Sequence, residues 1–521
     1  MCRLRLVLLL GCLPAASLSP QGAPQSRVRL VVALTVDQLR PDYLERWRAE
    51  LPGGLGRLLR EGVFFLRGEQ DHAITETAPG HSTLMTGRSP ASTGIASNDF
   101  GAVDSLSPLI GSAAVGASPR RFLGTTLFDW MVARDPATKG LSVSRKDRGA
   151  ILPMGRAKVP VFWYAEGRFT TSRYYSDTLP GWLREWNARD PVAKLKGTAW
   201  TLLRDASTYP ERDDRSFESG GTEVVFPHLL PDDWSRAASR LTESPYMDSL
   251  TLDVALQGAG ALRLGAREGT DFLAISLSTT DAIGHKWGPG SREMHDQILR
   301  LDRWLGWFLD SLITMVPADQ IAILLSADHG ATEFPEAGSG GRMGTPAAVR
   351  LLNQWASARY HINLGAIIEG GLLLADVPAL AARGVNVDSL SASLAAEIRK
   401  TPGVRAVYTP KSLAAAPSSD REAGRWRRQI PRATSWLVAV AVVDGWVWGT
   451  SRSSTGHGTT NLSDVRVPML FRIPGVAPRV VTRTVRTVDI APTLAAVLGV
   501  KPTQPVEGIV LPEVVHLPVR H

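Results

Sequence analysis

Three aspartates and three histidines in this sequence have the residue types and spacing of a divalent-metal site. They are Asp37, Asp281, His285, Asp328, His329 and His457. Carboxylate oxygens and imidazole nitrogens form a ligand set that suits Zn²⁺. Six ligands are too many for one tetrahedral zinc, but they fit two ions with positions left for a substrate. Two metal ions about 4 Å apart can hold the attacking and leaving oxygens of a phosphoryl transfer in line.

Thr77 is the candidate nucleophile for such a reaction. It is followed by Ala-Pro-Gly-His-Ser-Thr-Leu-Met, a pattern that predicts the start of a helix with Thr77 as its N-cap and Pro79 in the first turn. Free N–H groups and the positive end of the helix dipole would then stabilise an alkoxide or a phosphate. A threonine bound to a metal ion would be deprotonated and nucleophilic. From this stretch alone, an ordinary helix cap is the plainer interpretation.

The three aspartates each follow a nearly continuous apolar stretch. These stretches, at 28–36, 271–278 and 320–326, predict buried strands of a parallel sheet. Ligands of open α/β sheets bind outside the carboxyl ends of the strands. One aspartate at a strand end is usually a turn residue, but three of them, two with a histidine nearby, indicate a site.

The histidines have sequence contexts that suit ligands. His285 follows Asp281 by four residues, so one helical turn can present both side chains on one face. His329 directly follows Asp328, and Gly330 permits the bend that would let both reach one centre. His457 lies between two glycines, which allow close approach of a ligand to the backbone.

Lys146 and Arg148 are candidates for binding an anion. The stretch 141–148 begins as a short strand, and residues two apart on a strand share a face. Lys146 and Arg148 would then point together, with Asp147 on the opposite face. A strand on the protein surface whose charges alternate in sign explains the same pattern equally well.

The remaining pattern predicts an α/β fold with a central, mostly parallel sheet sandwiched by helices. The chain has 521 residues, of which 44% are hydrophobic and 21% charged, so it can bury a large core. Two insertions are expected. Residues 160–246 are rich in aromatic residues and predict a cap with its own small core, and residues 346–432 predict a small α+β unit. The turn Asp444-Gly445 predicts a hairpin over 437–448.

The first 23 residues resemble a secretory leader, with two arginines, a short apolar stretch and then small residues. Leu-Leu-Gly-Cys at 9–12 also resembles a bacterial lipobox, which would place a lipid anchor on Cys12. Both cysteines lie in this leader, so we expect no disulfide or thiolate chemistry in residues 24–521. We expect a periplasmic or extracellular protein.

Charge and hydropathy exclude two classes of partner. The net charge of +8 is spread along the chain without a run of five or six basic residues, which argues against nucleic-acid binding. After the leader no stretch has 18 uninterrupted apolar residues, so no transmembrane span is expected. We expect a monomer that acts on small phosphate esters.

These residues, in this order, resemble the alkaline phosphatase superfamily. The similarity is greatest to its PafA-type periplasmic alkaline phosphatases, which have a threonine nucleophile and are related to type I phosphodiesterases/nucleotide pyrophosphatases. It covers nearly all of the chain after the leader. The motifs are Thr-x-Thr-Ala-Pro-Gly-His at 75–81, Gly-Ile-Ala-Ser-Asn-Asp-Phe at 94–100, Lys-Asp-Arg-Gly-Ala-Ile-Leu-Pro at 146–153, Asp-x-x-x-His at 281–285, Asp-His-Gly at 328–330 and Gly-His-Gly at 456–458.

The resemblance implies a role for each candidate residue. One zinc would be held by Asp281, His285 and His457. A second would be held by Asp37, Asp328 and His329, with Thr77 bridging to it. Phosphate oxygens would be contacted by Asn98, Lys146 and Arg148. The chain departs from the family at Phe100, where family members often have tryptophan.

The resemblance further implies zinc-dependent hydrolysis of phosphate monoesters through a phospho-threonine intermediate. The nearest alternative is a phosphodiesterase/nucleotide pyrophosphatase on the same two-zinc scaffold. A sulfatase is disfavoured, because that family makes its nucleophile from Cys or Ser in a Cys/Ser-x-Pro-x-Arg context. A non-catalytic binding protein is disfavoured because the nucleophile and every expected ligand are present. Four other histidines, at 72, 81, 295 and 361, do not match metal positions and are expected to be structural.

Overall fold

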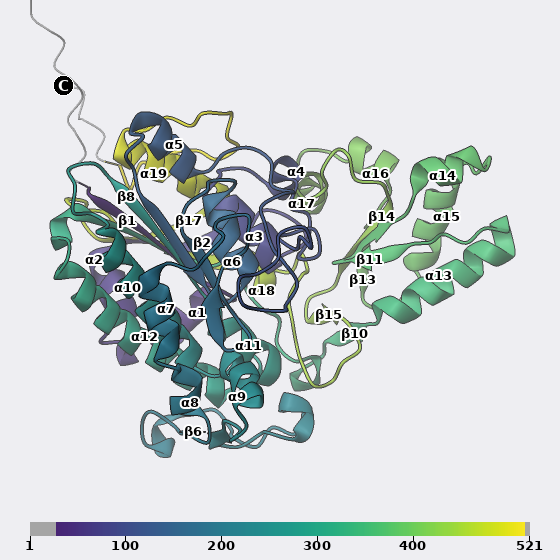
Figure 1. The fold of residues 1–521 in the computed structure, drawn as a ribbon. Helices are drawn as coiled ribbons and strands as arrows, with labels where there is room; N and C mark the ends of the chain where they lie inside the picture. Colours follow the sequence, from purple (N-terminus) through teal and green to yellow (C-terminus); the bar gives the residue numbers. More distant parts are fainter. Residues whose placement is uncertain (1–27, 516–521) are drawn as a thin grey trace, which may run out of the picture.

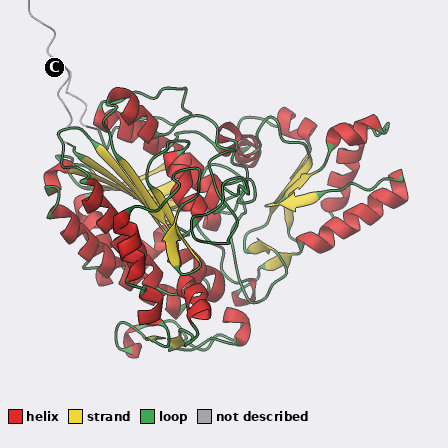
Figure 2. Ribbon diagram, viewed as in Figure 1, coloured by secondary structure: helices red, strands yellow, loops and turns green. Residues whose placement is uncertain are grey.

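A nine-stranded mixed sheet forms the centre of the computed structural model, which describes residues 28–515 (Figures 1 and 2). The expected leader and Cys12 lie outside the described residues. In sheet order the strands are β17 Arg479–Arg486, β2 Val63–Glu69, β16 Arg466–Arg472, β9 Ile321–Ser326, β1 Leu30–Val36, β8 Asp271–Leu277, β3 Gly140–Ser144, β4 Val161–Ala165 and β5 Arg168–Thr170.

The prediction of a mostly parallel sheet is confirmed. Strands β9, β1, β8, β3 and β4 are parallel neighbours, whereas β16 and β5 run antiparallel to the strands beside them. The register pairs Leu34 of β1 with Ile275 of β8 and with Leu325 of β9. The carboxyl ends of the three strands that precede the aspartates therefore lie side by side.

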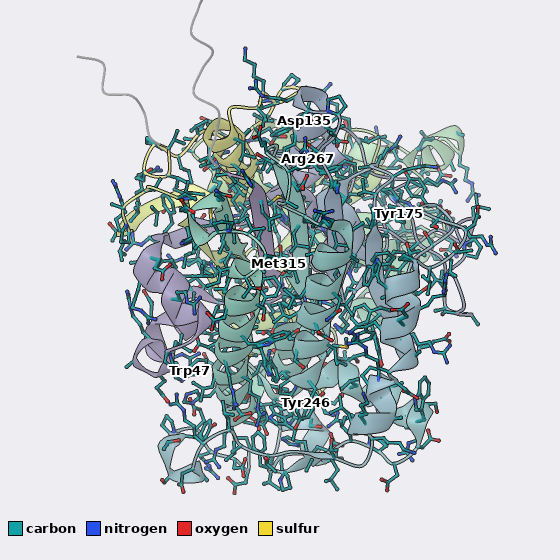
Figure 3. All side chains as sticks on the ribbon, turned by 60° about the vertical axis from the view of Figure 1, so that its left-hand side comes forward. Trp47, Asp135, Tyr175, Tyr246, Arg267 and Met315 are labelled. Carbon is teal, nitrogen blue, oxygen red and sulfur yellow. The ribbon has the colours of Figure 1, made fainter. Side chains whose placement is uncertain are left out.

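Helices cover both faces of the sheet because successive side chains of its central strands point to opposite faces. In β1, Val32 and Leu34 pack on one face and Val31 and Ala33 on the other. Figure 3 views the first face from outside, with Tyr246 and Met315 labelled. That face has α1 Pro41–Arg46, α2 Gly54–Glu61, α7 Gly181–Ala188, α10 Tyr246–Leu262 and α12 Arg292–Ile313. The other has α3 Thr77–Leu84, α5 Leu127–Arg134, α6 Asp147–Ile151 and α19 Ile490–Leu498.

The range 160–246 differs from the expected cap. It begins with β4 and β5, which are strands of the central sheet. The prediction that its aromatic residues form a separate small core is wrong, because alternate side chains of β4 enter the two main cores: Phe162 and Tyr164 on one face, Trp163 on the other. The rest of the range contains α7, α8 Pro191–Leu195, α9 Trp234–Arg240 and the short pair β6 Ala199–Trp200 and β7 His228–Leu229.

The range 346–432 lies within a second body beside the central sheet, on the right in Figure 1. It is built on an antiparallel sheet in the order β11 Ile367–Glu369, β12 Leu372–Leu374, β14 Trp436–Val442 and β13 Val404–Tyr408. Its helices are α13 Thr345–Tyr360, α14 Val377–Ala382, α15 Val387–Ile398, α16 Pro410–Ala415 and α17 Arg421–Gln429. This sheet takes in residues beyond 432. The division of the chain into a catalytic domain with two insertions stays a prediction.

The expected hairpin over 437–448 is wrong. The turn is present, with Gly445 at a φ of +79°, but β15 Trp446–Trp448 pairs in parallel with β10 Gly341–Met343 and not with β14. The ring of Trp446 packs closely over two glycines. A Cβ at Gly341 would lie 2.6 Å from it, and one at Gly403 would lie 2.2 Å from it. Gly341 belongs to β10, so the ring of Trp446 packs against the strand with which β15 pairs.

The remaining α-helices of the described residues are short: α4 Pro90–Thr93, α11 Thr279–Trp287 and α18 Leu462–Val465. Within residues 28–515, no helix is both long enough and apolar enough to cross a bilayer.

Candidate active site

The three aspartates converge where β9, β1 and β8 end. Asp37 directly follows β1, Asp328 comes two residues after β9, and Asp281 lies on α11 after β8. All three are buried, with 0%, 0% and 4% of their surface exposed. Buried carboxylates need positive charge or protons nearby, because the interior solvates a charge poorly.

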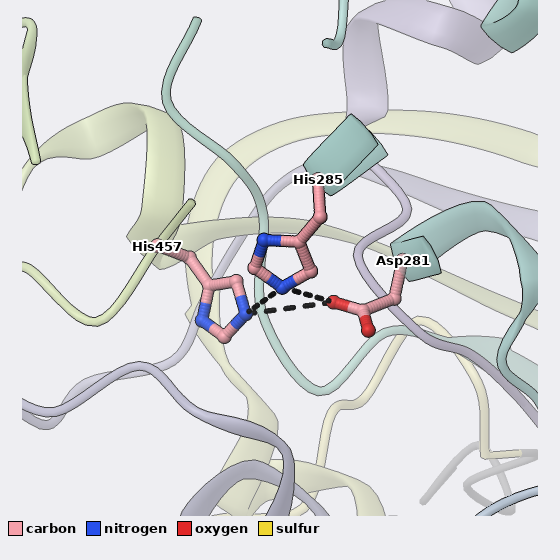
Figure 4. Close-up of side chains that lie close together, drawn as sticks. All are labelled: Asp281, His285 and His457. Atoms are coloured by element: carbon pink, nitrogen blue, oxygen red, sulfur yellow. Dashed lines mark hydrogen bonds and ion pairs between the residues drawn. The ribbon is translucent and has the colours of Figure 1, made fainter. Parts of the chain in front are cut away.

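Asp281, His285 and His457 form the first group of converging donor atoms (Figure 4). Oδ1 of Asp281 lies 3.2 Å from Nε2 of His285 and 3.5 Å from Nε2 of His457, and the two Nε2 atoms are 3.2 Å apart. Three ligands of a tetrahedral zinc at the usual bond lengths lie about 3.3 Å from one another. The triangle therefore has the size that a zinc ion requires.

The three histidines of the site share one orientation. Each directs Nδ1 at a backbone carbonyl oxygen: His285 at Thr455 (2.7 Å), His457 at Thr75 (2.7 Å) and His329 at Gly330 (2.9 Å). A neutral ring that donates from Nδ1 keeps a lone pair on Nε2. Metal-bound histidines are usually held in this way by a partner on the other ring nitrogen. The orientation thus fits metal ligands.

Asp37, Asp281 and His329 form a second group, with their donor atoms within 4.8 Å of one another. Nε2 of His329 lies 3.4 Å from Asp37 Oδ1 and 3.7 Å from Asp328 Oδ2. In the described part of the chain, Asp37 Oδ1 accepts no hydrogen bond and His329 Nε2 has no hydrogen-bond partner, whereas Asp37 Oδ2 faces Lys146 Nζ at 2.6 Å. The unsatisfied Oδ1 and Nε2 atoms fit a bound cation. The assignment of individual ligands to two separate ions stays a prediction.

The pKa shifts reflect the density of negative charge. Burial, and then the charges of Asp281 and Asp328, raise the pKa of Asp37. Burial alone would raise the pKa of Asp281, but Lys146 and His285 outweigh it and hold that pKa well below its usual range. Burial opposes protonation of His457, yet Asp281 raises its pKa to about 9. Without a metal ion, Lys146 and protons on the histidines and carboxyl groups must balance the negative charge of the site.

Thr77 is connected to both groups through Lys146, but it is not the helix cap. Helix α3 begins at Thr77, and Glu76, whose backbone is extended, is the N-cap residue. The expected cap hydrogen bond is instead made by Asn98, whose Oδ1 accepts from the N–H of Ala78 at 2.9 Å. The Thr77 hydroxyl is therefore free of a capping role, and Lys146 Nζ donates to its Oγ1 at 3.1 Å.

Lys146 and Arg148 do not share a strand face as expected. Strand β3 ends at Ser144, and Arg148 belongs to helix α6, which begins at Asp147. The chain can turn into a helix here because Gly149 packs tightly, where a Cβ would lie 2.7 Å from the hydroxyl oxygens of Ser144 and Ser276. Lys146 Nζ instead lies 2.6 Å from Oδ2 of Asp37 and 2.6 Å from Oδ2 of Asp281.

Asn98 and Arg148 lie near the start of α3. The N–H of Asn98 donates to Glu76 Oε2 at 2.8 Å, and its amide oxygen is occupied by Ala78, which leaves its amide NH₂ available. The side chain of Arg148 is 26% exposed. Burial raises the pKa of Glu76, and the charge of Arg148 is among the smaller influences that oppose this rise. No direct contact joins Arg148 to Thr77 in the described structure.

Three residues of the site were not singled out from the sequence. Gln38 contacts Asp281 and Asp328, and Glu76 holds Asn98. His81, expected to be only structural, places Nδ1 2.9 Å from the carbonyl oxygen of Thr77 and 3.1 Å from Asp328 Oδ2. The signals available were adjacency to Asp37 and Thr77 for the first two, and a spacing of one helical turn from Thr77 for His81.

The sequence matches the type I phosphodiesterase / nucleotide pyrophosphatase family over residues 31–461. It is 30% identical to alkaline phosphatase PafA of Elizabethkingia meningoseptica, over 91% of this chain and 92% of that protein. It is 31% identical to alkaline phosphatase PhoV of Synechococcus elongatus, over 93% of each chain. The crystal structure of PafA matches with a TM-score of 0.88 at 27% identity, covering 95% of this chain and 99% of that one.

Proposed function

Because the chain belongs to the type I phosphodiesterase / nucleotide pyrophosphatase family and is similar along nearly its whole length to alkaline phosphatases, we propose that it is a zinc-dependent alkaline phosphatase hydrolysing phosphate monoesters. The observation that carries the proposal is that two groups of metal-type donor atoms share Asp281 and that one lysine, Lys146, contacts both Asp281 and the hydroxyl of the buried Thr77.

Two zinc ions per chain are proposed. Asp281, His285 and His457 would hold one, and Asp37, Asp328 and His329 the other, with Thr77 bridging to it. Asp281 lies in both groups of converging donor atoms. When bound, the ions would act as Lewis acids that lower the pKa of the Thr77 hydroxyl and stabilise the oxygens of the reaction.

Thr77 Oγ1 is the proposed nucleophile. A bond forms between Oγ1 and phosphorus while the bond from phosphorus to the ester oxygen breaks, which gives a phospho-threonine and releases the alcohol. Water then attacks this intermediate and releases inorganic phosphate. Lys146 stabilises the Thr77 alkoxide through its hydrogen bond to Oγ1. The position of Thr77 at the start of α3 adds the positive end of the helix dipole.

Asn98, Lys146 and Arg148 are proposed to donate to the non-bridging phosphate oxygens. A monoester carries nearly two negative charges near neutral pH and a diester carries one. Cationic donors therefore favour the monoester, since charge-assisted hydrogen bonds are the stronger kind. The discrimination is proposed to come mainly from Arg148, because Lys146 also contacts Thr77, which attacks either ester. The alternative is a phosphodiesterase on the same scaffold, which the name of the matched family favours.

The setting of this activity is also proposed. The leader at 1–23 would export the chain to the periplasm or beyond, and cleavage after the leader or lipidation at Cys12 would complete its processing. The mature chain, 24–521, would work as a monomer on small phosphate esters. Residues of about 160–246 and 346–432 are proposed as insertions into one catalytic domain.

One comparison tests the proposal. The zinc-loaded protein is assayed with an aryl phosphate, the matched aryl phosphodiester and the matched aryl sulfate. We expect the highest kcat/KM for the phosphate, a lower value for the diester and the lowest for the sulfate. A higher kcat/KM for the diester would establish the alternative, and failure to turn over any of the three would refute the proposal.

A further inference from the structure

Gln38, the residue after Asp37, has a backbone conformation that its residue type does not favour. Its φ is +66°, and its side chain is fully buried. A left-handed conformation is uncommon for a residue with a Cβ. Unfavourable backbone conformations persist where the surrounding structure enforces them, and they cluster at functional sites. The contacts of Gln38 show what enforces this one.

Gln38 makes one hydrogen bond to each of two site carboxylates. Its backbone N–H donates to Oδ1 of Asp328 at 3.2 Å, and its side-chain Nε2 donates to Oδ1 of Asp281 at 3.0 Å. Carboxylates only accept hydrogen bonds, so the amide nitrogen must face Asp281. The Asp281 oxygen that it contacts is the same one that faces His285 and His457.

Packing against α11 holds the amide in place. A Cβ on Gly284 would lie 1.7 Å from Gln38 Oε1, so only a glycine at 284 lets the amide lie against this helix, less than one turn from Asp281. Oε1 itself has no hydrogen-bond partner among the described residues. An apolar side chain could fill this space without leaving a buried oxygen unsatisfied. Filling the space therefore does not account for an amide here.

We propose that Gln38 is a positioning residue that fixes the carboxylates of Asp281 and Asp328 relative to each other. Its side chain orients the Asp281 oxygen toward the two histidines of the first group. Its left-handed backbone turns the N–H toward Asp328, the carboxylate next to His329 of the second group. The inference rests on the proposed function, since it takes these carboxylates to be metal ligands.

Two variants and one control test the proposal. Gln38→Leu keeps most of the volume and removes the donor to Asp281. Gln38→Gly also removes it, retains the N–H toward Asp328 and adopts a positive φ without strain, so it should fold. Gln429→Leu is the control. Gln429 is equally buried and donates to the carbonyl of Ala96 at 2.6 Å, but it contacts none of the donor atoms of the two groups.

The readouts are the affinity for each zinc ion, by competition with a chromophoric chelator, the visible spectrum of the Co²⁺-substituted protein, and Tm. Loss of a hydrogen-bond partner to a metal ligand typically weakens metal binding about 10- to 100-fold. We expect both Gln38 variants to bind one of the two zinc ions more weakly by this factor and to change the cobalt spectrum. Gln38→Gly should bind the other zinc ion with wild-type affinity, because it retains the N–H that faces Asp328. Gln429→Leu should lower Tm with unchanged zinc affinity.

Wild-type zinc affinity and an unchanged cobalt spectrum in both Gln38 variants would overturn the inference while leaving the proposed function intact. If the wild type itself bound no zinc, the proposed function and the inference would fall together. The wild-type measurement therefore separates the two failures.

Discussion

The ammonium group of Lys146 donates a hydrogen bond to the hydroxyl oxygen of Thr77 across 3.1 Å. The same nitrogen lies 2.6 Å from a carboxylate oxygen of Asp37 and 2.6 Å from one of Asp281. One cation thus contacts the proposed nucleophile and two proposed ligand residues. Arg148, on the following helix, makes no such contact, and its side chain is partly exposed. The two cations therefore have different predicted effects.

Replacing Lys146 should slow both ester classes, whereas replacing Arg148 should slow the monoester more. Lys146→Ala removes a donor to Thr77, which attacks either ester. Arg148→Ala removes a charge that only the doubly charged monoester uses fully. A charge-assisted hydrogen bond contributes about 1.5–3 kcal/mol, which corresponds to about 10- to 100-fold in rate. The measurement is kcat/KM for matched aryl mono- and diesters. An equal loss of kcat/KM for both esters in Arg148→Ala would show that Arg148 does not interact with the second negative charge of the monoester.

Removal of metal should abolish phosphate release, and zinc should restore it. His457→Ala should retain about one zinc ion per chain, because it removes a donor of the first group only. The control is His361→Asn. His361 is exposed, lies outside both groups and has a φ of +55°, which asparagine tolerates. Elemental analysis of the dialysed proteins gives the count. Two zinc ions in His457→Ala would contradict the ligand assignment.

Stability should fall with rising pH because of two buried glutamates outside the site. Burial, together with the nearby Glu293, raises the pKa of Glu218 to about 9, and burial raises the pKa of Glu293 to about 8, from an ordinary value of 4.5. At pH values between the unfolded-state pKa of 4.5 and the folded-state pKa values of about 8 and about 9, the folded state holds protons that the unfolded state has released. The free energy of unfolding therefore decreases as pH rises through this window.

Glu218→Gln tests this dependence, because the amide cannot ionise. Its free energy of unfolding, measured by urea denaturation from about pH 6 to about pH 9, should fall less steeply than that of the wild type. Comparison at each pH cancels the groups that both proteins share. Parallel profiles would mean that Glu218 is not protonated in the folded state.

The sequence predicted the convergence of the aspartates because the signal was local. Apolar stretches long enough to be buried strands, each followed by an aspartate, indicate carboxylates at one edge of a parallel sheet. Asp281 and His285 were predictable for the same reason, since a spacing of four residues places both on one helix face. The structure contains all of these features.

Features that depend on tertiary packing were not predictable. The alternating charges of 146–148 fit a strand, but Gly149 packs against Ser144 and Ser276 and allows a helix. The predicted turn at Gly445 is present, yet the next strand pairs with β10, where Trp446 packs over Gly341. The left-handed backbone of Gln38 has no signal in its residue type.

Thr77 is the proposed nucleophile, and kcat of Thr77→Ala with an aryl phosphate tests this role most directly. The variant is zinc-loaded and its metal content is matched to the wild type, so that lost activity cannot come from lost metal. We expect kcat to fall by several orders of magnitude, because no hydroxyl remains to attack phosphorus. Thr77→Ser keeps the hydroxyl and should retain measurable activity. Wild-type turnover by Thr77→Ala with both zinc ions bound would contradict the role of Thr77 as nucleophile.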